Sequence, residues 1–402
     1  MNYTGFTVCN LAYLPRATVL AESFQRYTGQ TLKIFIFDRK SETTLPDKLA
    51  EIVWIEDLGI DRWEQLAFKY DIIEFSTSLK PFIARRLFAQ AEYVIFFDPD
   101  TSLFGPVTPI FEQLGDRSIL LTPHYIAPQP DTPMESDLGM MRFGSFNLGF
   151  FAVKRCNESH RFLEWWSKRC ISHCYMESQF GLSTDQKWVT ITPCLFQDIA
   201  ISFHPGLNMA PWNSFERSAT RQGDGSFMVN GRFPLVFFHF SNFRPDDPQY
   251  LAKRASSEHG SHRQDLLELG TAYRDALERF AQFGTGVRYA FDYMSDGSYI
   301  SPALRRAYAA VLSELPPDHR PFDSNGVVGR FARRNGLTIR SLVPFRYAGF
   351  ADAQRAGWQL KVIFLLLRVT LRVIGPNRFS NLGRLFVYLS SYRQTRGLWI
   401  YP

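Results

Sequence analysis

The segment Tyr93–Asp100, Y-V-I-F-F-D-P-D, joins an apolar run to two acids that stand one residue apart. Aromatic and β-branched residues favour a buried strand, and Pro99 stiffens the turn between Asp98 and Asp100. In open α/β sheets, ligands bind beyond the carboxyl ends of the strands. The segment therefore predicts two carboxylates at such an edge, which are hard oxygen ligands suited to Mg²⁺ or Mn²⁺ and to a phosphorylated substrate.

Segments typical of strands and helices alternate before these acids. Phe6–Asn10 and Leu32–Phe37 have the pattern of strands, and Ala17–Tyr27, between them, has that of a helix. Alternation on this spacing favours βαβ units. We therefore expect an α/β fold, with a mostly parallel sheet flanked by helices and at least two βα units before Asp98.

The chain has 402 residues, a length that favours two or three domains, or one large domain with an appendage. Charge is distributed unevenly along it. Residues 328–402 contain thirteen Arg or Lys and one acid, a net of +12, whereas the whole chain carries +6, so residues 1–327 carry −6. Helical patterns follow residue 250, and Pro and Gly mark a linker near residue 320. We predict a catalytic domain over 1–250, a helical extension over 251–327 and a basic amphipathic tail over 328–402.

The tail includes the apolar segment Trp358–Ile374, which also carries Lys361, Arg368 and Arg372. These charges interrupt the apolar run, so a membrane-spanning helix is not expected. Because their spacing is seven and four residues, they share one helical face, which is typical of a helix that lies in a membrane interface. A core helix or a partner-binding helix is the alternative. We expect the tail to bind an anionic membrane surface.

Three further motifs follow Asp98 and Asp100 in order. Asn147 lies in F-N-L-G-F-F-A-V, Asp185 and Gln186 follow Ser-Thr at a predicted helix start, and His239 lies in F-F-H-F-S-N-F-R-P with Arg244. Each motif alone is weak, since an Asn before Gly often forms a turn and an Asp at a helix start is often a cap. A single His on an apolar strand is often a core residue. The specific signal is their occurrence together in this order.

This order resembles that of the GT-A nucleotide-sugar glycosyltransferases, especially the retaining family 8 enzymes of the glycogenin and lipopolysaccharide galactosyltransferase type. That family has D-x-D after an apolar strand, then F-N-x-G, D-Q and H-F-x-G-x-x-K-P. The resemblance covers roughly residues 5–250. Two positions depart from it, because Asn242 stands where the family has Gly and Arg244 where it has Lys.

The resemblance implies a GT-A fold and a metal-dependent glycosyltransferase that transfers a sugar, with retention, from a nucleotide-sugar, most simply a UDP-sugar. Mn²⁺ or Mg²⁺ would be held by Asp98, Asp100 and His239 and would neutralise the diphosphate leaving group. Asp98 would be shared between ion and donor. The acceptor would be a saccharide or lipid-linked saccharide of a bacterial cell-surface polysaccharide or lipopolysaccharide.

Further residues receive roles on the same basis. The donor would be contacted by side chains that could stack on its base, bind its base or ribose, or neutralise its phosphates: Tyr13, Asp38, Lys80 and Arg244. The reacting centre would be formed by Asp185, Gln186 and Asn147, with Asp185 as the candidate nucleophile or base. The stretch that contains His204, Asn208, Trp212 and Asn213 has a composition suited to carbohydrate contacts or to an ordinary packed loop.

Three other functions fit part of the pattern. A haloacid-dehalogenase-type phosphatase has a similar D-x-D-x-T motif, but on its first strand. A nucleotidyltransferase shares the fold and ion, but has an N-terminal Gly-rich loop that Cys9–Arg16 lacks. The third is a non-catalytic scaffold at a membrane surface. The start of the chain lacks a secretory signal pattern, and five Cys are too few and too irregular for a disulfide framework. We expect a cytoplasmic, peripheral membrane protein that binds no nucleic acid.

Overall fold

The computed structural model describes residues 1–128, 136–259, 263–284, 286–338 and 357–390. The chain forms two compact units. Unit 1 comprises Met1–Trp63 and Ile72–Ala290, and unit 2 comprises Glu64–Asp71 and Phe291–Pro402.

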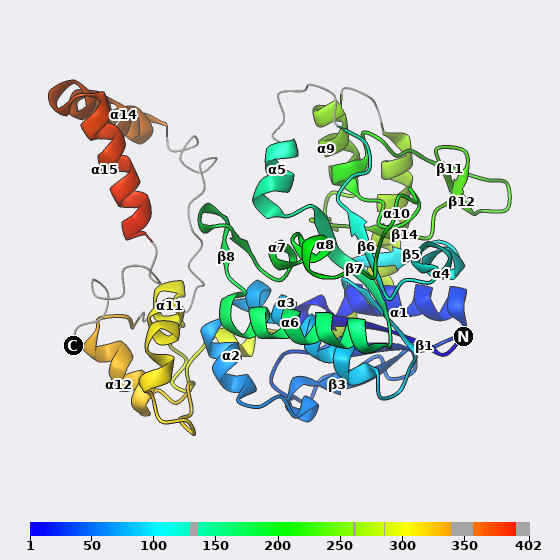
Figure 1. The fold of residues 1–402 in the computed structure, drawn as a ribbon, viewed down its shortest axis with the longest axis horizontal. Coiled ribbons are helices and arrows are strands. Elements are labelled where there is room, and N and C mark those ends of the chain that lie inside the picture. The colour runs from blue at the N-terminus through cyan, green and yellow to red at the C-terminus, as the bar shows by residue number, and fades with distance from the viewer. Residues whose placement is uncertain (129–135, 260–262, 285, 339–356, 391–402) are drawn as a thin grey trace. The chain divides into compact units, whose positions relative to one another are not determined.

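A seven-stranded sheet forms the centre of unit 1 (Figure 1), with the strand order β10-β6-β7-β4-β1-β2-β3. The strands are β1 (Tyr3–Cys9), β2 (Leu32–Ile36), β3 (Ala50–Trp54), β4 (Tyr93–Phe97), β6 (Ile119–Pro123), β7 (Phe146–Lys154) and β10 (Ile199–Ile201). All neighbouring pairs are parallel except those that β7 makes with β4 and β6. The predicted α/β class with a mostly parallel sheet is confirmed.

The direction of β7 brings two motifs together. Because β7 is antiparallel to β4, its first residues lie at the edge where β4 ends, and Phe97 is paired with Phe150. The N–H of Asp98 donates to the carbonyl of Gly149 across this edge, at 2.7 Å. Asn147 and Asp98 are therefore neighbours in space although 49 positions separate them in the chain.

Alternate side chains of the sheet pack against helices on its two faces. Ile34, Ile95 and Phe97 join the core formed with α1 (Leu14–Thr28) and α4 (Thr108–Leu114). On the opposite face, Phe151 contacts Trp166 of α6 (Asn157–His173), and Lys80 of α3 (Ile72–Leu87) lies over the ring of Phe96. Burial of both faces explains why the sequence of β4 is almost wholly apolar.

Shorter elements complete unit 1. They are β5 (Thr101–Leu103), α5 (Ser136–Phe143), β8 (Met176–Glu177), β9 (Leu182–Ser183), α7 (Gln186–Val189), α8 (Thr192–Leu195), β11 (Ala219–Arg221), β12 (Phe227–Val229), β13 (Phe233–Pro234), β14 (Phe237–His239), α9 (Tyr250–His259) and α10 (Gln264–Arg279). Strand β14 pairs with β5 rather than with the main sheet, and this pairing places His239 opposite Thr101. The His-containing motif thereby reaches the residues that directly follow Asp98 and Asp100.

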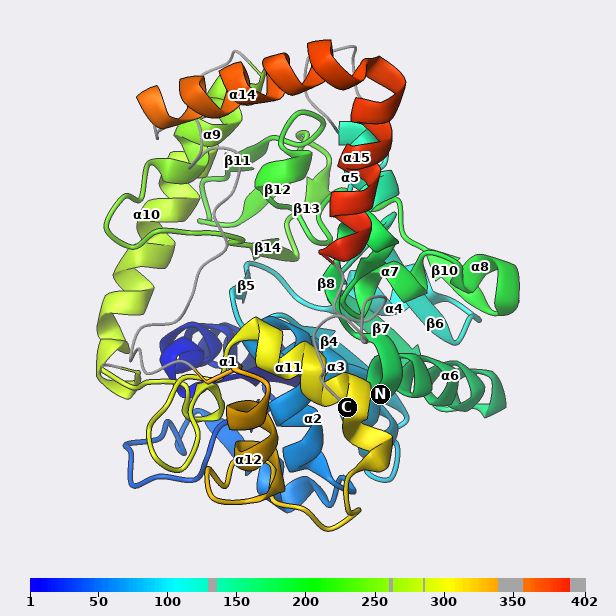
Figure 2. The same ribbon diagram turned by 90° about the vertical axis from the view of Figure 1, so that its left-hand side faces the viewer.

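Helix α10 belongs to unit 1, which extends to Ala290. The division into a catalytic domain over 1–250 and a helical extension over 251–327 stays a prediction. Tyr273 and Leu277 of α10 are buried in a core with Phe240 and Phe243. Helices α9 and α10 run beside each other (Figure 2). Burial of this apolar face against the His239 segment is the physical reason that α10 is integral to unit 1.

Unit 2 contains most of α2 (Trp63–Lys69), then α11 (Pro302–Val311), α12 (Val327–Arg334), α14 (Trp358–Ile374) and α15 (Pro376–Leu389). The buried side chain of Arg305 donates to the carbonyls of Ala67, Phe68 and Tyr70 and to Asp292. These bonds satisfy the carbonyls at the end of α2, which have no partner within the helix. Parts of the predicted 328–402 tail, residues 339–356 and 391–402, lie outside the described residues.

Candidate active site

The two acids that follow β4 meet His239 at the edge of the sheet. Nε2 of His239 lies 3.2 Å from Oδ1 of Asp100 and 3.9 Å from Oδ2 of Asp98. Each of the three side chains offers one ligand atom, and these atoms lie within 4.8 Å of one another. Two carboxylates and an imidazole at this separation match the ligand types that Mn²⁺ and Mg²⁺ accept, so these residues fit a divalent ion.

Asn208 determines which ring nitrogen of His239 faces the acids. The amide nitrogen of Asn208 donates to Oγ1 of Thr122 and Oδ1 of Asn147, both at 3.0 Å. Its oxygen therefore faces Nδ1 of His239, at 3.3 Å, and Nδ1 must carry a proton to bond with it. In the neutral ring Nε2 is then the unprotonated nitrogen, which is the form that binds a metal ion.

Gly149 provides the space that the His239 ring occupies. A Cβ atom at position 149 would lie 2.3 Å from Cε1 and 2.6 Å from Nδ1 of His239, and 2.8 Å from Oδ1 of Asn147. These separations are far inside van der Waals contact, so any side chain here would displace the ring. The Gly in the F-N-x-G motif is thus explained by the close approach of a buried imidazole.

The electrostatics of the three groups are coupled. Burial disfavours the charged ring of His239, but Asp100 and then Asp98 outweigh this effect and raise its pKa. Burial likewise disfavours the Asp100 carboxylate, but the charges of His239 and Arg16 hold its pKa below the usual value. Both shifts thus have one main favourable cause, the attraction between the charged ring of His239 and the carboxylate of Asp100.

Lys80 lies between two acids, buried in α3. Its Nζ is 3.2 Å from Oδ1 of Asp98 and 3.4 Å from Oδ2 of Asp185, and it donates to the carbonyl of Leu148 at 2.9 Å. Burial disfavours the ammonium, but Asp185 and Asp98 offset it and raise the pKa of Lys80. A permanent cation thus connects the ion site to the predicted reacting centre.

Asp185 is almost completely buried, and its backbone carbonyl and its side chain each accept a hydrogen bond. The indole of Trp166 donates to its carbonyl at 3.1 Å, and the hydroxyl of Thr184 donates to Oδ1. Thr184 has φ of +47°, an unfavourable conformation for a β-branched residue. The predicted alternative, a helix cap, does not apply to Asp185, because its side chain makes no capping hydrogen bond to α7. Desolvation raises its pKa despite the charge of Lys80.

Gln186 and Lys80 both form hydrogen bonds with the backbone of Leu148, one with its N–H and the other with its carbonyl. Oε1 of Gln186 accepts from the N–H of Leu148 at 3.2 Å, while the carbonyl of Leu148 binds Lys80. Nε2 of Gln186 donates to the carbonyl of Phe143 in α5. Both ends of the Gln186 amide are therefore bonded to backbone, which positions the start of β7.

Asn147 is likewise surrounded by polar partners. Its Oδ1 accepts from the N–H of Gly149 and from Asn208, and its Nδ2 lies 3.4 Å from Nε2 of His124. These bonds place Asn147 directly behind His239. The sequence-based role of Asn147 beside the donor sugar stays a prediction.

The predicted donor contacts are less closely grouped. Tyr13 is 43% exposed, with the guanidinium of Arg16 over its ring at 4.7 Å. Asp38 follows β2 but is buried, and it accepts from the backbone N–H groups of Leu11, Arg39 and Ala290. Arg244 is exposed and packs over Tyr250 at 4.3 Å.

Asn242, which stands where the resembling family has Gly, keeps a backbone conformation that Gly adopts freely. Asn242 has φ of +59°, in the left-handed region that Gly adopts freely and that Asn tolerates better than most residues. The bend after His239 therefore has the conformation that a Gly would allow.

The stretch that contains His204, Asn208, Trp212 and Asn213 makes several contacts within the chain. Asn208 orients His239, Asn213 donates to the carbonyls of His124 and Asn208, and Trp212 packs edge-on against the His239 ring at 5.0 Å. His204 binds the N–H of Gly206 instead. Its mixture of polar and aromatic residues reflects the enclosure of a buried imidazole.

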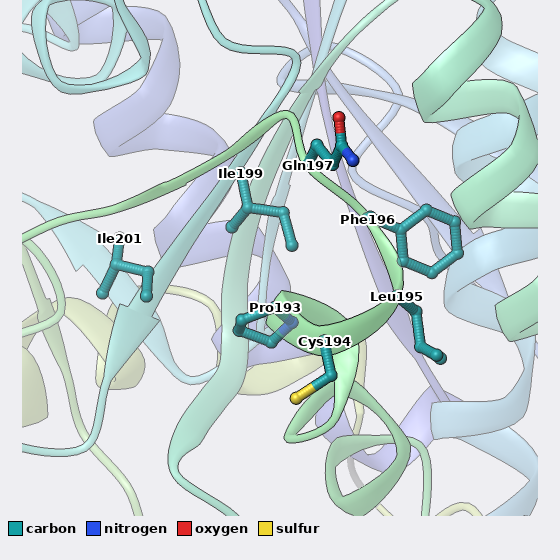
Figure 3. A pocket seen from close by; sticks show the side chains of 7 residues that line it. All are labelled: Pro193, Cys194, Leu195, Phe196, Gln197, Ile199 and Ile201. Atoms are coloured by element: carbon teal, nitrogen blue, oxygen red, sulfur yellow. The ribbon is translucent and has the colours of Figure 1, made fainter.

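A separate hollow of about 350 Å³ lies between α8 and β10 (Figure 3). It is lined by residues 193–197, Ile199 and Ile201, and it includes none of the predicted site residues.

No protein-family model matches the chain. Among curated proteins, the chain is 25% identical over 284 residues to uncharacterized protein YfnF of Bacillus subtilis (strain 168), which covers 69% of this chain and 92% of that protein. It is 30% identical over 175 residues to uncharacterized protein YfnD of the same organism, which covers 42% of this chain and 54% of that protein.

Similar solved structures are glycosyltransferases by name. The galactosyltransferase LgtC, in complex with donor and acceptor sugar analogs, is 14% identical with a TM-score of 0.43 and covers 71% of this chain and 97% of its own. Glycosyltransferase GlyE of Streptococcus pneumoniae TIGR4 is 13% identical, with a TM-score of 0.37. The match covers 68% of this chain and 63% of the GlyE chain.

Replacement of Lys80 tests whether its charge holds the site together. In Lys80→Met, Asp98 and the buried Asp185 lose their shared cation, and we expect a loss of about 3–5 kcal/mol in the free energy of unfolding at pH 7. Burial already raises the pKa of Asp185, and loss of the cation raises it further. The loss should therefore shrink as the pH falls and Asp185 becomes neutral. Urea unfolding at pH 5 and pH 7 measures both effects.

Two further variants make this test specific. Lys80→Met with Asp185→Asn should recover part of the lost stability, because the isolated buried charge is removed. Lys168→Met, which breaks the exposed pair with Glu164, should change stability little. If Lys80→Met and Lys168→Met lowered the free energy of unfolding equally, the burial of Lys80 would be shown to be unimportant.

Proposed function

We propose that this chain is a metal-dependent glycosyltransferase that moves a sugar from a nucleotide-sugar, most simply a UDP-sugar, to a saccharide or lipid-linked acceptor of a bacterial cell-surface polysaccharide. The observation that carries the proposal is the convergence of Asp98, Asp100 and His239, with Lys80 joining this group to Asp185. The order of these residues along the chain adds support through its resemblance to family 8 glycosyltransferases. The glycosyltransferase names of similar solved structures agree with it.

The ion, when bound by Asp98, Asp100 and His239, would neutralise the charge that develops on a departing nucleoside diphosphate. Asn208 holds the proton of a neutral His239 ring on Nδ1, so Nε2 is the nitrogen that would bind the ion. The ammonium of Lys80 lies 3.2 Å from Asp98 and 3.4 Å from Asp185, so it offsets the repulsion between the two acids. The chain thus supplies a site that tolerates concentrated negative charge.

Asp185 is the residue that we assign to the reacting centre. It is joined to the ion site through Lys80, and the bonds to Trp166 and Thr184 fix its direction. Gln186 holds Leu148 and with it the start of β7. A carboxylate positioned in this way can accept hydrogen bonds from sugar hydroxyls or stabilise a developing positive charge at the reacting carbon.

The arrangement disfavours a haloacid-dehalogenase-type phosphatase. In that fold the nucleophilic Asp follows the first strand of the chain, whereas Asp98 follows the fourth strand.

Donor hydrolysis measures the proposed activity directly. With a panel of nucleotide-sugars and Mn²⁺, we expect the wild-type chain to release a nucleoside diphosphate, and Asp100→Asn to reduce the rate about 100-fold or more because the ion loses a ligand. Asp116→Asn, an exposed acid after α4, is the matched control and should behave as wild type. Hydrolysis of no donor, or full activity of Asp100→Asn, would contradict the proposal.

A pair of glycine variants tests the ion site without any substrate. Gly149→Ala should weaken Mn²⁺ binding about 10- to 100-fold, because the new Cβ displaces His239. Gly139→Ala in α5 should leave it unchanged, since a Cβ there meets no atom within 4 Å. Isothermal titration with Mn²⁺ provides the comparison, and equal affinity in both variants would remove His239 from the ion site.

We also propose that α14 and α15 bind an anionic membrane surface. The two helices carry Lys361, Arg368, Arg372, Arg378 and Arg384 and no acid, and large apolar side chains such as Phe364, Leu366 and Phe386 are exposed. None of the described helices has the length and apolar character that a membrane span requires. Exposed apolar and basic side chains on such helices favour the lipid interface.

Vesicle sedimentation tests this attachment. Removal of residues 353–402, or the double change Arg368→Glu with Arg372→Glu, should reduce binding to phosphatidylglycerol-containing vesicles at least tenfold, and high salt should weaken wild-type binding. The control is the double change Arg320→Glu with Arg330→Glu, at two exposed residues outside these helices, which should leave vesicle binding largely unchanged. Undiminished binding by the truncated chain would rule out the tail as the anchor.

A further inference from the structure

Arg16 occupies a position where a cation is unfavourable. It is the third residue of α1, and the first turn of that helix contains no acid. The positive end of the helix dipole lies there, so a charged Arg is destabilising unless an anion is near. Its presence in the first turn is the signal that sequence analysis could have used, because such a residue calls for an anionic partner outside the helix.

Hydrogen bonds in series connect Arg16 to the ion site. Nη2 of Arg16 donates to the carbonyl of Phe243 at 3.2 Å, the N–H of Phe243 donates to the carbonyl of Phe240 at 2.9 Å, and the N–H of Phe240 donates to the carbonyl of Asp100 at 2.7 Å. Phe240 directly follows His239. The guanidinium is therefore attached to the segment that carries one proposed ion ligand and binds the backbone of another.

The backing of this segment is rigid. Tyr273 of α10 stacks on Phe240 with ring centroids 3.8 Å apart and an angle of 2° between the rings, and it also contacts Phe243 edge-on at 5.2 Å. Stacking of this kind limits movement of the carbonyl that Arg16 binds. The charge of Arg16 also reaches the ion site, since it contributes with His239 to the low pKa of Asp100.

Arg16 lies between the two ends that a nucleoside diphosphate would occupy. On one side it packs over the exposed ring of Tyr13, the predicted platform for the base, and on the other it is tied to the segment bonded to Asp100. Arg244, the cation predicted from sequence to bind phosphate, is exposed and packs over Tyr250 instead. A diphosphate that joins a base on Tyr13 to an ion on Asp100 would have to pass Arg16.

We propose that Arg16, rather than Arg244, is the side chain that binds the diphosphate of the donor. The inference rests on the proposed function, since it takes the donor to be a nucleoside diphosphate derivative. A guanidinium presents several N–H donors in one plane and binds phosphate oxygens in pairs. Among the residues described, Phe243 accepts from only one end of the Arg16 side chain, so further N–H groups face other directions.

Isothermal titration with a nucleoside diphosphate panel that includes UDP and GDP, in the presence of Mn²⁺, tests the inference. We expect Arg16→Met to raise the Kd of the nucleotide that binds about 10- to 100-fold, the usual range for loss of charge-assisted hydrogen bonds. Arg16→Lys should recover part of this loss, because it restores the charge without the planar group. Arg244→Met should stay within threefold of wild type.

Two controls separate binding from folding. The affinity of Arg16→Met for Mn²⁺ alone should not fall, because loss of a nearby positive charge does not weaken the binding of a cation. Its affinity for the uncharged nucleoside of the nucleotide that binds should stay within about threefold of wild type, since this probe carries no phosphate. Wild-type affinity of Arg16→Met for the nucleotide, or a loss confined to Arg244→Met, would overturn the inference while leaving the proposed function intact. If the wild-type chain binds Mn²⁺ but no nucleoside diphosphate, the proposed function itself fails and the inference with it.

Discussion

The contacts of the buried Lys80 ammonium are the interactions on which the arrangement of the site depends. The ammonium bonds to Asp98 at the end of β4, to the buried Asp185 before α7, and to the carbonyl of Leu148 in β7. Two carboxylates this close to one cation and sheltered from water would repel each other strongly without it. Because the three partners come from separate elements, the same charge holds the end of β4, the start of β7 and the residue before α7 together at one edge of the sheet.

A second set of contacts surrounds His239, and it explains residues whose roles the motifs left open. Gly149 supplies the space for the ring, Asn208 fixes its protonated nitrogen, and Asn147 supports Asn208. An ion ligand that is held by both shape and hydrogen bonds loses little conformational freedom when it binds. The F-N-x-G motif therefore acts on the site through His239 as well as through any contact with the substrate.

Much of the fold and the core of the site could be predicted from sequence, because those signals are local. The apolar run before Asp98 indicates a buried strand, and Asp98, Asp100 and His239 are recognisable by residue type and order. Arg16, Asn208 and the part played by Tyr273 were less accessible, since each depends on contacts between segments far apart in the chain. The assignment of phosphate binding to Arg244 rested on a motif position, and its packing over Tyr250 depends on side-chain direction, which a motif does not encode.

The sequence by itself determined the α/β class, the placement of two acids at a strand end, and the amphipathic basic helices near the end of the chain, since periodicity and charge decide these locally. Only the tertiary structure decided that β7 runs antiparallel and delivers Gly149 to Asp98, and that α10 packs within unit 1. Only the tertiary structure, too, placed Lys80 between Asp98 and Asp185. The physical reason is that strand order and the burial of charges depend on the packing of the whole unit, whose free energy is shared among residues distant in the chain.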